Sequence, residues 1–191
     1  MLCSFAVVLA QAGNGDVLKD IQKFQDDLNG EYKDPAKSPL KGEQLTNFKG
    51  IHFFPANLNY VVQATFVRTP AEKTFKMPTS GAKTPEYVKY GQVTFTLFGK
   101  QYKLGVYQSL DLAKTKEYND YLVILFKDQT SGKETYGGGR YIDLTIPTGN
   151  TITINFNKAY HPYCAYAEGY NCPIPPAENY LPVRVEAGVR F

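Results

Sequence analysis

The sequence predicts an all-β domain with one N-terminal helix, and three observations lead to this fold class. The chain of 191 residues contains 15 Tyr and 12 Phe, which favour strands. From residue 51 onward, apolar and polar residues alternate in short runs that glycine and proline interrupt. Only one segment repeats its apolar residues at helical spacing. We therefore expect an antiparallel meander curled into a barrel-like or folded sheet, with an irregular C-terminal tail rich in proline and tyrosine.

The first twelve residues, MLCSFAVVLAQA, differ in kind from the rest of the chain. They carry no charge and end in the triplet Ala10-Gln11-Ala12. An apolar stretch closed by small residues is typical of a secretory signal peptide, so we expect residues 1–12 to be cleaved off after Ala12. A buried N-terminal strand is the alternative. Cleavage would leave two cysteines in a protein exported to the oxidising periplasm or cell envelope.

The segment from Asp16 to Tyr32 is the predicted helix. Its apolar residues recur at steps of three and four, which places one set on a single face: Val17, Leu18, Ile21, Phe24, Leu28 and Tyr32. The pair Asn29-Gly30 supplies a stop signal, and a polar connector follows from Lys33 to Gly50. We divide the chain into a signal peptide (1–12), a helix with its connector (13–44) and a β domain (45–191).

Strand patterns then follow one another along the β domain. Short runs occur at residues 51–54, 60–67 and 75–77. The segment 92–107 predicts a hairpin around Gly99-Lys100, because a glycine in the first position suits a type II′ turn. The continuous apolar run 121–126 predicts a central strand that is covered on both faces. The segments 141–146 and 151–156 predict a second hairpin, closed by residues 147–150.

Two cysteines, Cys164 and Cys172, lie eight positions apart in the tail. In an exported protein the simplest interpretation is a disulfide, worth roughly 2–3 kcal/mol in the chain-entropy model. One alternative is a metal site that adds His161, but it has only three ligands and no paired Cys-x-x-Cys spacing. The other is a nucleophilic Cys164 activated by His161, which requires a free thiol. We predict the disulfide, no metal site and no cofactor.

Several function classes are disfavoured by the sequence. A net charge of +3 with scattered lysines argues against nucleic-acid binding. No apolar run reaches the ~18 residues of a membrane span. Ser131 lies outside the G-x-S-x-G nucleophile motif, and Gly137–Gly139 is not followed by the Lys-Ser/Thr of a phosphate-binding loop.

The run Gly137-Gly138-Gly139-Arg140 is the strongest positive signal for a ligand site. Consecutive glycines permit close backbone approach or a bulge, and the arginine fork suits a carboxylate or phosphate. Alternatively, Arg140 pairs with Glu178 or Asp143 and holds the tail on the sheet. The tyrosines 160, 163, 166 and 170 either line a groove for a sugar or peptide or pack the tail. The candidate ligand-binding residues are Asp128, Thr130, Ser131, Tyr136, Arg140, Asn157, Tyr160, Tyr163, Glu178 and Asn179.

Three stretches resemble one known family. The run FKDQTSGKETYGGGR, then NFNKAYHPYCAY, then NCPIPPAENYLPV with a following V-x-A-G are similar to the bacterial domain-of-unknown-function family 1684. The upstream run FKGIHFFPANLNYVVQATF resembles the middle segment of that family, so the likeness covers Leu45 to Gly188. It implies an exported or envelope protein and brings no known activity. Many relatives have a longer N-terminal region, where this chain has the Lys33–Gly50 connector.

Carried over residue by residue, the family pattern includes most of the candidate ligand-binding residues. Such a pattern encodes a fold as easily as a site. Its positions in this chain are Asp128, Thr130, Ser131, Gly132, Thr135, Tyr136, Gly139, Arg140, Asn157, Ala159, Tyr160, Pro162, Cys164, Cys172, Pro173, Pro175, Pro176, Glu178, Asn179, Leu181 and Pro182.

Three functions remain open. The leading hypothesis is a non-enzymatic β-barrel-like module that binds a small molecule, glycan or peptide near Arg140 and the tyrosine-rich tail. The second is an envelope hydrolase or transferase with Asp128 and Glu178 as acid and base beside Arg140, which requires both carboxyls to flank a cleft within ~5–10 Å. The third is a purely structural envelope module.

Overall fold

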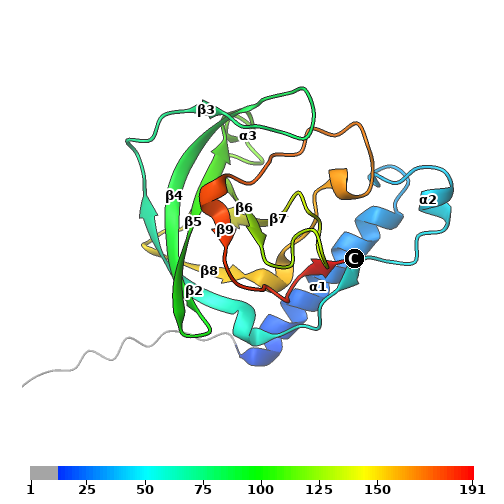
Figure 1. The fold of residues 1–191 in the computed structure, drawn as a ribbon, viewed down its shortest axis with the longest axis horizontal. Coiled ribbons are helices and arrows are strands. Elements are labelled where there is room, and N and C mark those ends of the chain that lie inside the picture. Colours follow the sequence, from blue (N-terminus) through cyan, green and yellow to red (C-terminus); the bar gives the residue numbers. More distant parts are fainter. Residues whose placement is uncertain (1–12) are drawn as a thin grey trace, which may run out of the picture.

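One long, curled sheet dominates the fold. The computed structural model describes residues 13–191, and Figure 1 shows the sheet wrapped around a core with one long helix beside it. The larger elements are α1 (Asn14–Lys33), β2 (Val61–Arg68), β4 (Glu86–Leu97), β5 (Lys100–Ser109), β6 (Tyr121–Asp128), β7 (Arg140–Thr145) and β8 (Thr151–Asn155). The shorter ones are α2 (Glu43–Thr46), β1 (His52–Phe53), β3 (Phe75–Lys76), α3 (Leu110–Ala113), β9 (Tyr180–Leu181) and β10 (Val189–Arg190).

The sheet is an antiparallel half-barrel, as the predicted fold class requires. Its strand order is β7-β6-β5-β4-β2-β8, with β3 added to β4 and β9 added in parallel to β6. A separate two-stranded sheet joins β1 to β10, so the end of the chain pairs with its early part.

The first hairpin is confirmed, but its turn lies one residue earlier than predicted. Leu97 pairs with Lys100, so the turn residues are Phe98 and Gly99, both with positive φ (49° and 76°). Two consecutive positive φ values make a type I′ turn, whose twist matches that of the flanking strands. The shift moves each cross-strand pair by two residues, and the same side chains therefore still face the core.

The second predicted hairpin is wrong. β7 pairs with β6 and β8 pairs with β2, so the two strands form opposite ends of the curled sheet. The physical reason is that β6 and β2 each have a second edge that needs a partner, and β7 and β8 supply one each while the sheet stays open between them. Residues 146–150 instead link the two end strands, and Ile142, Leu144, Val61 and Thr153 line a depression between them.

The strand β6 is covered on both faces, as its apolar run predicts. Leu122, Ile124 and Phe126 point into the main core inside the half-barrel. Val123 and Leu125 belong to a second cluster on the outer face, which also contains Met77, Tyr107 and Tyr141. The two clusters make β6 the central strand of the domain.

The helix α1 packs against the tail more than against the sheet. Its buried residues are Ile21 and Tyr32, while Leu18, predicted to lie on the buried face, is 42% exposed. Tyr32 forms a third cluster with Leu40, Ile51 and Val189, against which Tyr163 and Tyr166 of the tail also pack. Figure 1 shows the C-terminus beside α1. Within residues 13–191, no helix has the length and apolar character needed to cross a membrane.

Candidate functional site

Arg140 lies in the interior, where it attaches the tail to the sheet. Its side chain has no exposed surface and forms an ion pair with Asp128, with 3.3 Å between Nη2 and Oδ1. Its guanidinium also donates to the backbone carbonyls of Val185 and Ala187. Arg140 therefore pins the C-terminal tail, but its carboxylate partner is Asp128 rather than the expected Glu178 or Asp143.

The glycine before Arg140 makes this burial possible. Gly139 has a φ of 95°, and a Cβ there would lie 2.6 Å from the carbonyl oxygen of Phe126. Only glycine allows such a close approach in this backbone conformation. The Gly-Gly-Gly-Arg run thus permits close packing, as one of its two interpretations predicts.

Asp128 is also fully committed to structural contacts. Its carboxylate accepts hydrogen bonds from the backbone N–H of Val185 at 2.7 Å and from the Thr130 hydroxyl at 2.8 Å. Ser131 closes the same turn by accepting from the Asp128 N–H at 3.1 Å. A carboxylate held in this way matches the scaffold alternative rather than a general acid or base in an open cleft.

Three other predicted residues also make internal contacts, and two of them hold backbone segments together. The buried Asn157 bonds to both the N–H and the carbonyl of Asn57. The buried Asn179 does the same with Gly105 and donates to the carbonyl of Leu125. Glu178 accepts from Lys89 at 2.8 Å and from the Tyr107 hydroxyl, so it belongs to a different set of contacts from Asp128.

His161 is a buried neutral imidazole. Its Nε2 accepts a hydrogen bond from the backbone N–H of Tyr136 at 3.1 Å, so the proton is on Nδ1, which faces the Tyr166 hydroxyl at 3.1 Å. Burial, with the positive charge of Arg140, lowers the pKa of His161 to about 3. Both ring nitrogens are therefore occupied by structural bonds.

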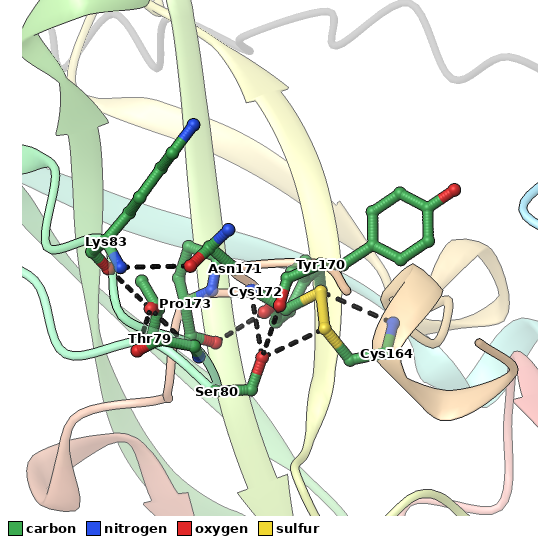
Figure 2. Close-up of a disulfide and its surroundings, with 10 residues drawn as sticks. Thr79, Ser80, Lys83, Cys164, Tyr170, Asn171, Cys172 and Pro173 are labelled. Carbon is green, nitrogen blue, oxygen red and sulfur yellow. Dashed lines mark hydrogen bonds between the residues drawn. A yellow bond between two sulfur atoms is a disulfide. The ribbon is translucent and has the colours of Figure 1, made fainter. Parts of the chain in front are cut away.

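The predicted disulfide between Cys164 and Cys172 is present, with its Cα atoms 6.3 Å apart. Figure 2 shows that the loop closed by this disulfide, residues 164–172, forms hydrogen bonds with Ser80 in the loop before β4. The Ser80 N–H donates to the Cys172 carbonyl at 2.9 Å, and the Ser80 Oγ accepts from the Cys172 N–H at 3.1 Å. Asn171 accepts from the Lys83 N–H at 2.9 Å in the same clasp. The oxidised pair is not available as a nucleophile.

A pocket of about 500 Å³ opens between α1, β7 and the disulfide-bonded part of the tail. We call it the tyrosine pocket, because five tyrosines line it: Tyr32, Tyr141, Tyr160, Tyr163 and Tyr170. The helix contributes Phe24 and Leu28, and the tail adds Pro162 and Pro173. Pockets of this size and aromatic character are typical of small-molecule sites.

The disulfide clasp positions one wall of the tyrosine pocket. Tyr163 directly precedes Cys164, and Tyr170 and Asn171 directly precede Cys172, which itself contacts the pocket. The rings of Tyr163 and Tyr170 pack edge to face with centroids 5.1 Å apart. The helix forms the opposite wall, and the Tyr163 hydroxyl donates to Glu31 of α1.

Asp143 provides the carboxylate from β7. Its Oδ1 accepts hydrogen bonds from the hydroxyls of Tyr121 at 2.7 Å and Tyr160 at 2.8 Å. Asp143 is exposed, yet the surrounding protein raises the pKa of its carboxyl by burial, against the opposing effect of the two hydroxyls. Burial likewise raises the pKa of Tyr160, so this phenol keeps its proton and donates.

The structure thus separates the predicted ligand-binding residues. Tyr160 and Tyr163 line the tyrosine pocket, whereas Asp128, Thr130 and Arg140 form a buried network. Sequence reasoning missed the contributions of Phe24, Leu28 and Glu31, which lie on one stripe of α1 at helical spacing. The helical spacing predicts that Phe24 and Leu28 lie on a buried face. No pattern in the sequence indicates that Glu31 lies opposite the tail. Among residues 13–191, no three His, Cys, Asp or Glu side chains converge as metal ligands would.

Comparisons with known proteins agree with the motifs. The model of the family described as "Protein of unknown function (DUF1684)" matches residues 46–190. The solution NMR structure of an uncharacterized protein from Haloarcula marismortui is 30% identical, with a TM-score of 0.72, over 93% of this chain and 95% of that one. No match was found among curated proteins. The chain belongs to the DUF1684 family of proteins of unknown function.

Proposed function

We propose that this protein is a binding module that holds a small organic molecule in the tyrosine pocket. The observation that carries the proposal is the pocket itself, about 500 Å³ in volume and lined by five tyrosines together with Phe24 and Leu28. Two of the predicted ligand-binding residues, Tyr160 and Tyr163, lie in it. An aromatic wall of this kind buries apolar ligand surface, and a few polar groups fix the orientation.

Two features support binding rather than acid–base catalysis. The carboxylates first considered for catalysis, Asp128 and Glu178, are held by Arg140 and by Lys89 with Tyr107, respectively. Within the tyrosine pocket, Glu31 and Asp143 accept hydrogen bonds from tyrosine hydroxyls whose raised pKa keeps them protonated. These hydrogen bonds favour a role in orienting a ligand.

A ligand-observed NMR screen of small aromatic and amine fragments tests this proposal. We expect hits that compete with one another, and in protein-observed spectra each hit should shift the backbone amide signals of Asp143 and Tyr163. Leu28→Trp, which fills the pocket from α1, should abolish these hits in a folded protein. Leu112→Trp, at an exposed leucine in α3 outside the pocket, is the matched control and should retain them. Hits that persist in Leu28→Trp, or a screen without hits, would contradict the proposal.

Export is a second part of the proposed function. The disulfide between Cys164 and Cys172 supports an oxidising compartment, and the predicted signal peptide falls on residues 1–12, outside the described residues. Mass spectrometry of the protein isolated from its producing cells should give Gly13 as the first residue and no free thiol. A chain that retains residues 1–12 in the cytoplasm would refute export without affecting the pocket.

A further inference from the structure

The charged residues that line the tyrosine pocket are all acidic. Three carboxylates lie along it, those of Asp27, Glu31 and Asp143, whereas none of its lining residues is a lysine or arginine. Asp27 is neutralised by Lys23, with 2.5 Å between its Oδ2 and the Lys23 Nζ, and both side chains are largely exposed. Glu31 and Asp143 have only tyrosine hydroxyls as partners among the described residues. Two carboxylates therefore face the pocket without a compensating cation.

We propose that the ligand is an organic ammonium ion, a protonated amine or a quaternary ammonium group on an apolar body, which inserts between Glu31 and Asp143. This inference rests on the proposed function of the tyrosine pocket and adds the charge of its ligand. The positive group neutralises the two carboxylates, and the apolar body covers Phe24, Leu28 and the tyrosine rings.

The hydrogen-bonding inventory of the pocket favours a cation over an anion, and it suits the N–H donors of a protonated amine in particular. The hydroxyls of Tyr160 and Tyr163 already donate to Asp143 and Glu31, and that of Tyr141 donates to the Pro173 carbonyl. These three hydroxyls therefore offer mainly acceptor lone pairs to a ligand, as do the carboxylates. A protonated amine carries only donors and is complementary to such a surface. A carboxylate or phosphate needs donors and would meet two negative charges.

The arrangement of the rings strengthens this complementarity. Tyr141 and Tyr160 pack nearly perpendicular to one another, with centroids 5.8 Å apart and an interplanar angle of 75°. Tyr32 and Tyr163 form a similar pair at 6.0 Å and 66°. Tyr160 and Tyr163 remain partly exposed, whereas Tyr32 and Tyr141 are buried behind them. The negative quadrupole of an accessible ring face attracts a cation. A phenol that donates to a carboxylate has a more electron-rich ring, which makes that attraction stronger.

A series of three molecules with one shape isolates the effect of charge. Choline is the cation, 3,3-dimethylbutan-1-ol is its neutral carbon analogue, and 3,3-dimethylbutanoate is the anion. Each is titrated into the disulfide-intact protein at millimolar concentrations while the amide signals of Asp143 and Tyr163 are followed. We expect choline to bind roughly tenfold more tightly than the alcohol, as a desolvated cation–π contact predicts, and the anion to be the weakest.

Variants then identify the carboxylates responsible. Asp143→Asn and Glu31→Gln remove one negative charge each with little change of shape, and each should bring choline close to the affinity of the alcohol. Binding of the alcohol should persist in both, which shows that the pocket remains formed. Asp111→Asn, at an exposed aspartate paired with Lys114 outside the pocket, should leave the preference unchanged.

The outcomes separate this inference from the proposal on which it rests. Choline binding that loses its advantage in Asp143→Asn or Glu31→Gln supports both. Equal binding of choline and the alcohol, tightest binding of the anion, or a cation preference that survives both substitutions would overturn the charge assignment and keep the pocket as a binding site. Failure of all three molecules to bind would overturn both.

Discussion

The side chain of Arg140 holds the tail of this protein on its sheet. Its guanidinium contacts Asp128 and the backbone carbonyls of Val185 and Ala187, all in the interior. Burial lowers the pKa of Arg140, while the charge of Asp128 acts in the opposite direction. Arg140 was a candidate for binding a ligand anion, but it stabilises the interior instead. The sequence around Arg140 could not show this, because the tail that covers it lies more than 40 residues further along the chain.

Removal of this arginine should be strongly destabilising. Arg140→Ala leaves Asp128 buried without its cation, so we expect the free energy of unfolding to fall by roughly 3–5 kcal/mol. Urea denaturation at neutral pH measures the change. Arg184→Ala serves as the control, because Arg184 pairs with Glu134 and Glu186 at the surface and its removal should destabilise the protein far less. If the two substitutions lowered the free energy of unfolding equally, Arg140 would not hold the tail on the sheet.

His161 makes stability depend on pH. The imidazole has a pKa of about 3 in the native protein and about 6.5 when unfolded, so the unfolded chain binds more protons between these values. The stabilisation that neutral His161 gives the native state is complete above pH 6.5 and is lost as the pH falls. The free energy of unfolding should therefore decrease by about 3 kcal/mol between pH 7 and pH 4. In His161→Gln, whose amide oxygen can still accept from the Tyr136 N–H, the pH dependence of unfolding should become flatter. An unchanged slope would show that His161 does not titrate on unfolding.

The disulfide-bonded loop is the element that shapes the tyrosine pocket. It holds the loop around Ser80 through hydrogen bonds (Figure 2), and its residues Tyr170 and Asn171 line the tyrosine pocket. Because the clasp joins segments about 90 residues apart, loosening it affects the pocket wall as well as the tail.

The double substitution Cys164→Ser/Cys172→Ser tests that role. Loss of the cross-link should lower the free energy of unfolding by roughly 2–3 kcal/mol through the greater entropy of the unfolded chain. Amide hydrogen exchange of Tyr163 and Asn171 should accelerate, whereas that of the central strand β6 should change only with global stability. The disulfide-intact protein is the reference. Unchanged exchange at Tyr163 and Asn171 would mean that the clasp does not hold the pocket wall.

The predicted elements were correct where a local pattern determines the structure. The helical period of residues 16–32 and the continuous apolar run of β6 each depend on nearby residues, and both are confirmed. The pairing of β7 with β6 and of β8 with β2 depends on which strand edges remain open in the whole sheet. Proximity in sequence therefore misled the prediction of a β7–β8 hairpin.

The molecule as a whole is a sheet that curls without closing. β7 and β8 are the two end strands of the sheet. The helix α1 and the tail lie beside the gap between these strands. The tyrosine pocket arises there from three separate parts of the chain: α1, β7 and the tail. The sequence could indicate that the tyrosines of the tail form a surface, but the acidic residues opposite them become visible only when these parts meet.

The most direct test of this account is a measurement of intermolecular nuclear Overhauser effects from the bound choline methyl protons. We predict contacts to the ring protons of Tyr141, Tyr160 and Tyr163, and their loss in Leu28→Trp. Contacts to residues outside the tyrosine pocket, such as those around the Asp128 turn, would contradict the central claim that the pocket between α1, β7 and the tail is the binding site.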